Sequence, residues 1–206
     1  MFARSMTVHG NPDALDAGIA FIRDEAMPEL LASAGCTGLS MLVDRQYGRS
    51  IVTSAWRDAD AMAASACTVR PMWDRSTQVM GGLAEIDEWE IAVLHRRQHT
   101  TEGATSRVTW VQTPPDRVAD AIDTFRMVLV PQLEELPGFR SLSLMVDRTT
   151  GRGALSFTVD GREALAQTRG RGGMLRETFI ERMGVDVTDM GEFDLVLAHL
   201  GVPETV

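Results

Sequence analysis

The sequence lacks lysine altogether, because all 20 basic residues of the 206-residue chain are arginine. Without a lysine amine, the chain has no Schiff base or lysine nucleophile to offer, and it has no phosphate-binding loop of the type that needs lysine. Cysteine is almost as rare, since Cys36 and Cys67 are the two in the chain. Both cysteines lie in the first half of the chain, and the second half, which repeats the first, has none at the equivalent positions. No disulfide framework is therefore expected.

Long apolar runs and an excess of positive charge are also missing. No apolar run approaches the roughly 20 residues that a membrane span requires, and the start of the chain lacks the apolar core of a secretory signal. The formal net charge of −9 disfavours a nucleic acid backbone or an anionic membrane as a partner. Because 44% of the residues are hydrophobic, the chain can bury a substantial core, and we expect a cytoplasmic globular protein.

What the sequence does contain is a long internal repeat. The stretch "SMLVDRQYGRSIVTSAW" at 40–56 returns as "SLMVDRTTGRGALSFTV" at 143–159, a displacement of 103 residues. One inserted residue then shifts the last strand to a displacement of 104, which aligns His95 with His199. We therefore predict a first repeat at 1–95, a linker at 96–106 and a second repeat at 107–206. Other residues that recur at the displacement of 103 are Val8, Pro12, Asp13, Ile19, Arg23, Pro28, Leu30, Gly35, Met80 and Gly81.

The predicted order of elements within a repeat is strand, helix, strand, strand, helix, strand. In the first repeat, Asn11 is the expected N-cap of the first helix, Pro12 stands in its first turn, and Pro28 should kink it. Two β-rich runs joined by "RQYG" predict a hairpin, with Gly48 placed to adopt positive φ. The motif VDRxxGR is then a hairpin turn, in which aspartate and arginine are solvated or pair across the strands.

This order predicts an α+β fold. A βαββαβ unit forms a four-stranded antiparallel sheet with both helices on one face, which leaves the other face apolar and uncovered. Two copies in one chain can bury these faces against each other. We therefore predict two ferredoxin-like βαββαβ repeats packed sheet to sheet as an intrachain pseudo-dimer, and leave open whether whole chains associate further.

The junction "IVTSAWRDADAM" resembles the corresponding segment of the antibiotic biosynthesis monooxygenase (ABM) domain of the dimeric α/β-barrel superfamily. In that family, a tryptophan ending the third strand precedes a short acidic and alanine-rich helix opening, as Trp56, Asp60 and Ala61 do here. The second repeat keeps "DGREAL" but has Val159 in place of the tryptophan. The resemblance covers nearly the whole chain, and it implies tandem ABM-like domains forming an intrachain dimeric α/β barrel, with a pocket between sheet and helices in each half.

The resemblance leaves two classes of function open. The first is a cofactor-independent, monooxygenase-like enzyme acting on a small aromatic or enolisable compound, which needs a proton acceptor and apolar walls around the resulting anion. The alternative is a non-catalytic small-molecule-binding or stress-response protein built on the same barrel. Both imply a small hydrophobic or aromatic ligand, and the sequence does not decide whether the protein is an enzyme.

The first repeat offers candidate site residues. His9 ends the first strand near the expected pocket mouth, and its imidazole suits a general base, although a strand-end histidine is often simply solvated. Gln112 occupies this register in the second repeat and cannot act as a base. The other residues expected to bound the pocket of the first repeat, or to belong to its core, are Trp56, Arg70, Met72 and Trp73.

The second predicted helix is interrupted in both repeats, at Pro71 in "SACTVRP" and at three glycines in "TRGRGG". This interruption is a candidate lip over the pocket, or else a plain surface loop. In the second repeat, Arg169 and Arg171 lie beside it and could receive a carboxylate or another anion.

Cofactors are not predicted. Haem-degrading members of the resembled family carry a histidine ligand on the second half of the second helix, whereas "DAMAASACTVRPMWDRS" and "REALAQTRGRGGMLRETF" contain no histidine. The sequence therefore disfavours haem. The acidic residues near the last strands alternate with apolar residues, which is typical of a strand with one wet face, so no metal site is predicted either.

Overall fold

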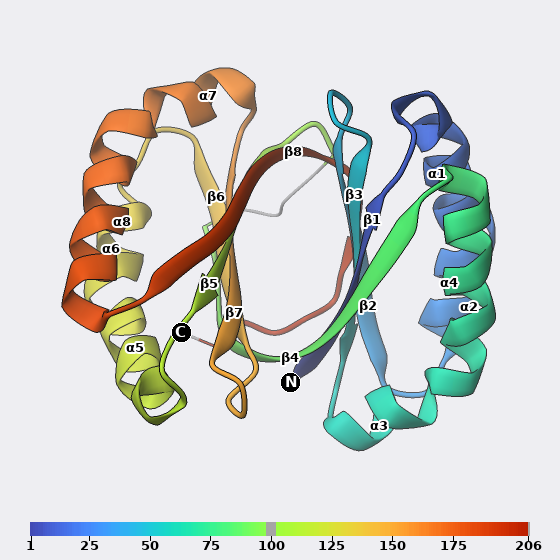
Figure 1. The fold of residues 1–206 in the computed structure, drawn as a ribbon, viewed down its shortest axis with the longest axis horizontal. Coiled ribbons are helices and arrows are strands. Elements are labelled where there is room, and N and C mark those ends of the chain that lie inside the picture. Colours follow the sequence, from blue (N-terminus) through green and yellow to red (C-terminus); the bar gives the residue numbers. More distant parts are fainter. Residues whose placement is uncertain (98–101, 206) are drawn as a thin grey trace. The chain divides into compact units, whose positions relative to one another are not determined.

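A computed structural model describes residues 1–97 and 102–205 of the chain. In this part of the chain the strands are hydrogen-bonded in the closed order β1-β3-β2-β8-β5-β7-β6-β4, and helices flank them (Figure 1). The contacts divide the chain into two compact units, which are described separately below. The first unit comprises Met1–Glu88 and Phe193–Val202, and the second comprises Trp89–Glu192 and Pro203–Val206.

The first unit contains an antiparallel sheet in which β3 lies between β1 and β2, and the end of β8 continues the sheet beyond β2. The helices of this unit cover one face of that sheet (Figure 1). The elements are β1 (Phe2–His9), α1 (Leu15–Phe21), α2 (Met27–Ala32), β2 (Cys36–Asp44), β3 (Arg49–Trp56), α3 (Ala59–Ala64), α4 (Ala66–Met80) and the start of β4 (Leu83–Arg96).

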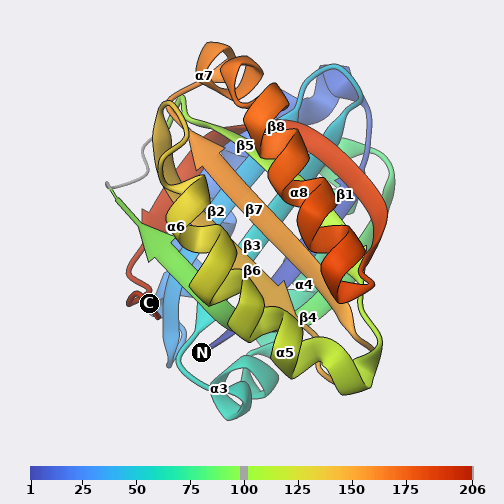
Figure 2. The same ribbon diagram turned by 90° about the vertical axis from the view of Figure 1, so that its left-hand side faces the viewer.

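The second unit repeats this arrangement, with β7 between β5 and β6 and with the end of β4 paired to β6. Figure 2 shows α6 and α8 crossing one face of its strands. The elements are β5 (Thr105–Gln112), α5 (Val118–Thr124), α6 (Val130–Leu133), β6 (Phe139–Val146), β7 (Arg152–Val159), α7 (Arg162–Gln167), α8 (Arg169–Met183) and the start of β8 (Asp186–Leu200).

The predicted α+β class and the two ferredoxin-like repeats are confirmed, and the strand order is that of an intrachain dimeric α/β barrel. The compact units differ from the sequence repeats in one respect: each last strand, β4 or β8, begins in its own unit and ends in the other. β4 ends at Arg96 and β5 begins at Thr105, so both strands enter the predicted linker 96–106. Residues 98–101 of that linker lie outside the described residues.

The first helix of each repeat begins as predicted but changes its winding along its length. The Asn11 side chain accepts a hydrogen bond from the backbone N–H of Asp13 at 3.0 Å, and Pro12 opens the 3₁₀ turn η1 (Pro12–Ala14). A π-helical turn precedes the proline of each repeat, η2 (Ile22–Ala26) before Pro28 and η4 (Phe125–Leu129) before Pro131. The wider turn fits a proline, which donates no N–H and crowds the carbonyl four residues earlier.

The break in the second helix is real, but the predicted position is wrong. Pro71 lies inside α4, and the glycines of "TRGRGG" lie inside α8. The helices break earlier, at Ser65 and at Thr168, whose hydroxyls donate to the carbonyls of Met62 and Leu165 at 2.7 Å. Each hydroxyl bonds the carbonyl three residues earlier, a bond that Thr77 also makes inside the unbroken α4.

The repeated VDRxxGR motif forms the hairpin turn, as predicted. The Asp44 carboxylate accepts a hydrogen bond from the backbone N–H of Gln46 at 2.9 Å, and Asp147 accepts one from Thr149 at 2.8 Å. Gly48 has φ +68, and a Cβ there would lie 2.4 Å from a backbone oxygen. The motif therefore recurs because both hairpin turns need the same aspartate and glycine.

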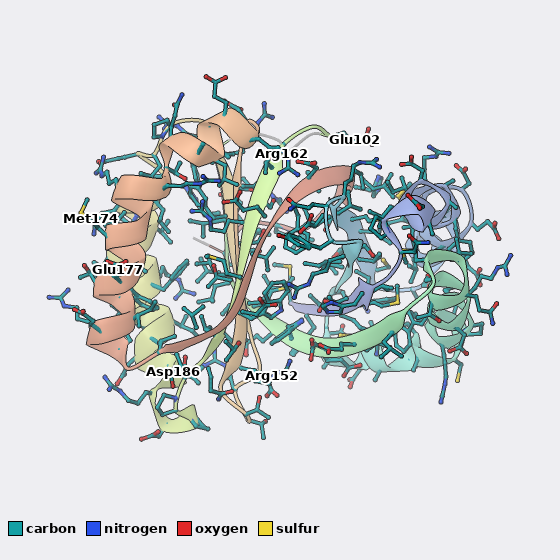
Figure 3. All side chains as sticks on the ribbon, turned by 45° about the horizontal axis from the view of Figure 1, so that its top comes forward. Glu102, Arg152, Arg162, Met174, Glu177 and Asp186 are labelled. Atoms are coloured by element: carbon teal, nitrogen blue, oxygen red, sulfur yellow. The ribbon has the colours of Figure 1, made fainter. Side chains whose placement is uncertain are left out.

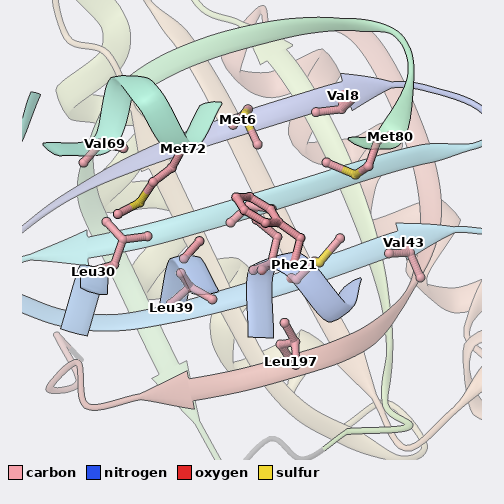
Figure 4. Packing of buried hydrophobic residues seen from close by; sticks show 14 of the residues in the cluster. Met6, Val8, Phe21, Leu30, Leu39, Val43, Val69, Met72, Met80 and Leu197 are labelled. Carbon is pink, nitrogen blue, oxygen red and sulfur yellow. The ribbon is translucent and has the colours of Figure 1, made fainter. Parts of the chain in front are cut away.

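The helices bury regularly spaced side chains against the sheet. In α4, Val69, Met72, Ser76 and Met80 are buried, which is the spacing of one helix face. Figure 4 shows Val69 and Met72 close to Leu30 in the core of the first unit. Among the described helices, none is long and apolar enough to cross a membrane.

Candidate functional site

A buried arginine lies on the first strand of the first repeat. Arg4 points to the helix side of β1 and its side chain is 3% exposed. Its guanidinium donates to the carboxylate of Glu88, to the Ser65 hydroxyl at 2.9 Å and to the Met62 carbonyl at 3.0 Å. The same guanidinium lies 5.3 Å from the ring centroid of Trp73. The helix break at Ser65 thus supplies a partner that keeps this buried charge satisfied.

The second repeat has an equivalent arginine with fewer partners. Arg107 on β5 has an 11% exposed side chain, and its Nη2 donates to Glu192 at 2.9 Å. Among the side chains that the structure describes, Glu192 is its one hydrogen-bond partner. The other carboxylate oxygen of Glu192 accepts from the exposed Arg169 at 3.3 Å. The Nε and Nη1 groups of Arg107 therefore remain available to a ligand.

Sequence reasoning missed both arginines, although the repeat carried the signal. Arg4 and Arg107 differ by 103 positions, and Glu88 and Glu192 differ by 104, so the known displacements align both ion pairs. A charged residue on the side of a strand that faces helices requires a partner, because an unpaired buried charge is costly. The aligned pairs therefore identify the same position between sheet and helices in each repeat.

Above Arg4, the first repeat has a very small cavity. Its volume is about 20 Å³, which is room for about one water molecule at roughly 10–15 Å³ per water. Val69 and Met72 of α4 and the half-buried Trp73 fill the space beside the strands. The lining residues are Arg4, Met6, Ile22, Ala26, Leu30, Val52, Ser54, Val69, Met72, Trp73 and Ser76.

The equivalent cavity of the second repeat is three times larger. Its volume is about 60 Å³, well above the roughly 10–15 Å³ that a single water molecule needs. Gly172 stands where the first repeat has Val69, and a Cβ built on it would make ordinary contacts with Leu136 and Thr168 at 3.5 and 3.8 Å. The lining residues are Arg107, Thr109, Leu129, Leu133, Leu136, Leu155, Phe157, Thr168, Gly172 and Phe179.

The arrangement of α8 explains how this cavity is bounded. Gly172 and Phe179 lie on the inner side of the helix and line the cavity. Met174 and Glu177 project from the outer side, where both are exposed (Figure 3). The cavity therefore has apolar walls from the helices and strands, and Arg107 with Thr168 provides the polar end.

His9 does not line the cavity of the first repeat. It ends β1 and is exposed, and strand alternation places it on the opposite face from Arg4 and Met6, which line that cavity. Gln112 lies on the corresponding face of β5 and donates to the Thr150 carbonyl at 2.7 Å. The role of His9 as a general base stays a prediction. His9 does not line the cavity of the first repeat, so it would not contact a ligand bound there.

The structure brings together two of the other predicted residues. Met72 and Trp73 share the cavity of the first repeat, whereas Arg70 is exposed on α4. Trp56 is fully buried, and its indole N–H donates at 3.0 Å to the hydroxyl of Ser54, which lines the cavity. Trp56 therefore supports the cavity wall from behind.

Arg169 and Arg171 lie on the first turn of α8 rather than in a loop. Arg171 is paired with Glu135 at 2.6 Å, and Arg169 is linked to the cavity through Glu192. Burial raises the pKa of the Glu192 carboxyl, but the hydrogen bond and charge of Arg107, together with Arg169, outweigh it and lower the pKa below its usual 4.5. Glu192 is thus an ionised bridge between two guanidiniums.

Among the described residues, no three histidine, cysteine, aspartate or glutamate side chains are grouped so that they could hold a metal ion. The titratable residue that lines each cavity is an arginine. Such a site can bind and orient a polar group, and it can stabilise negative charge at the Arg107 end.

The closed strand order, with helices on one face of each repeat, is the fold of ABM-like proteins of the dimeric α/β-barrel type. An anthrone oxidase-like protein aligns with a TM-score of 0.71 and 11% identity, over 97% of this chain and 92% of that one. A monooxygenase-like protein from Listeria innocua aligns with a TM-score of 0.56 and 10% identity, over 94% and 93% of the two chains. These likenesses show the fold.

No family model matches the chain. The Mycobacterium tuberculosis (strain H37Rv) protein Rv2557, which is described as uncharacterized, is 45% identical to it over 206 residues, or 100% of this chain and 92% of the relative. The chain belongs to the family of Rv2557.

Proposed function

We propose that this protein binds a small apolar compound in the cavity of the second repeat. The observation that carries the proposal is the difference in cavity volume, about 60 Å³ against about 20 Å³ at equivalent positions. Apolar walls with a few convergent polar groups are typical of ligand sites in proteins. The small volume favours a compound with a compact apolar end.

The test uses isovalerate and its neutral analogue isovaleramide as probes, with ligand-observed NMR as the readout. Gly172→Val places the residue of the first repeat into the second and should fill the cavity, so binding of both probes should be lost. Val69→Gly is the matched control, because it enlarges the other cavity and leaves Gly172 in place. Binding that survives Gly172→Val, or that is missing in the unmodified protein, would contradict the proposal.

A second candidate is a cofactor-independent, monooxygenase-like oxygenase acting on an aromatic or enolisable compound. The fold of the anthrone oxidase-like protein favours it, and Arg107 could stabilise the anion formed when an acidic phenol or enol loses its proton. The present cavity is smaller than an anthrone, so α8 would have to move outward to admit one. Oxygen uptake on addition of anthrone, lost in Arg107→Met, would support this candidate, and no uptake would remove it.

A further inference from the structure

The charges around the second cavity do not balance. Arg107 and Arg169 share the single carboxylate of Glu192. In the first repeat Arg4 is paired with Glu88, and Ala66 occupies the position of Arg169. Counting the described side chains bonded to Glu88 and Glu192, the second repeat therefore has one positive charge more than the first.

The hydrogen bonds show the same difference. Arg4 has a carboxylate, a hydroxyl and a carbonyl as acceptors, whereas in the described part of the second repeat Arg107 has the Glu192 carboxylate alone. Thr168 corresponds to Ser65 and lines the cavity, but its hydroxyl donates to the Leu165 carbonyl. A guanidinium has five N–H donors, so Arg107, which lines the cavity, has donors beyond the one bonded to Glu192.

We infer that the ligand of the second repeat is a small monoanionic acid, bound with its carboxylate against Arg107 and its apolar part among the leucine and phenylalanine side chains. This inference rests on the proposed binding function and adds the charge of the ligand to it. The ligand carboxylate would neutralise the excess positive charge and accept hydrogen bonds from the N–H groups of Arg107 that Glu192 does not use. Glu192 competes for the same guanidinium, and Arg169 acts through Glu192 as a positioning residue.

The experiment compares isovalerate with isovaleramide by calorimetric titration, since the two differ in charge and hardly in shape. The unmodified protein should bind the acid at least about tenfold more tightly than the amide, because hydrogen bonds to charged groups exceed those to neutral ones by this much. Arg107→Met should lower the affinity for the acid by at least about tenfold and so abolish that preference. Arg148→Met is the control, since it removes a surface guanidinium of the same unit that is paired with Glu90.

Glu192→Gln gives a result that a purely structural role would not produce. It removes the competing negative charge, so affinity for the acid should rise about threefold or more while affinity for the amide stays the same. Arg169→Met should lower acid affinity by about twofold, because this arginine is largely exposed and screened. Equal binding of acid and amide by the unmodified protein would overturn the anion inference alone. Binding of neither probe would overturn the proposed function as well.

Discussion

The two repeats hold the same arginine in different surroundings. In the first, Arg4 is saturated by Glu88, Ser65 and Met62, and large α4 side chains close the space beside it. In the second, Arg107 has one carboxylate partner, and a glycine leaves the space open. The first repeat is thus packed around its arginine, whereas the second repeat has a larger cavity beside its arginine. The difference shows that two copies of one fold can differ in the space left beside an equivalent arginine.

The largest expected effect comes from removing the saturated arginine. Arg4→Met should lower the free energy of unfolding by about 3 kcal/mol, because the buried Ser65 hydroxyl and the Met62 carbonyl lose a donor and the half-exposed Glu88 loses its partner. Arg107→Met should cost under about 1 kcal/mol, since fewer groups depend on it. Urea unfolding of the two variants measures both values, and equal losses would break the comparison.

A smaller effect is expected from opening the packed cavity. Val69 is 2% exposed in the core of the first repeat. Val69→Gly should destabilise the protein by about 2–3 kcal/mol, through lost packing and through the low helix propensity of glycine. Thermal and urea unfolding provide the measurement. A change within error of zero would mean that α4 does not pack as described.

The reverse substitution should have the opposite sign. Gly172→Val should stabilise the protein by about 0.5–1 kcal/mol, because it removes a glycine from the interior of a helix and buries two methyl groups in an existing cavity. The neighbouring side chains leave ordinary space for the new Cβ. Destabilisation by a similar amount would show that the cavity is too narrow for these methyl groups.

The smallest effect concerns pH. Glu192 has a lowered pKa in the folded protein, so its ionised form contributes stability above the unfolded value of 4.5, and this contribution is lost as the pH falls through the lower folded value. Glu192→Gln should therefore weaken the decline of stability as the pH falls below about 4.5. Unfolding free energies of both proteins across this range measure the effect. An unchanged pH dependence would mean that the bridge to Arg107 is weak.

The sequence predicted the fold well, because periodicity, capping residues and the displaced copies are local signals. Asn11, Gly48 and the paired VDRxxGR motifs each act as predicted. The helix break was misplaced because proline and glycine are tolerated within α4 and α8 when the surrounding packing holds the helix. The breaks fall instead at Ser65 and Thr168, whose hydroxyls donate to the preceding turn.

The site was harder to predict, because its character depends on volume and on partners far apart in the sequence. His9 was selected for its chemistry, whereas its face of the strand depends on the register of β1. The number of unused N–H donors on Arg107 depends on the hydrogen bonds that Thr168 and Glu192 make, and both residues are distant from Arg107 in the sequence. The aligned pairs Arg4 with Glu88 and Arg107 with Glu192 were nonetheless visible as a repeated feature.

The most direct test of the difference between the repeats is a methyl NMR titration of the full chain with isovalerate. The account predicts shifts of the Leu129, Leu133 and Leu136 methyl signals, which line the second cavity, while Leu30 and Val69 of the first cavity remain unchanged. Shifts at Leu30 and Val69 instead, or equal shifts in both repeats, would contradict it.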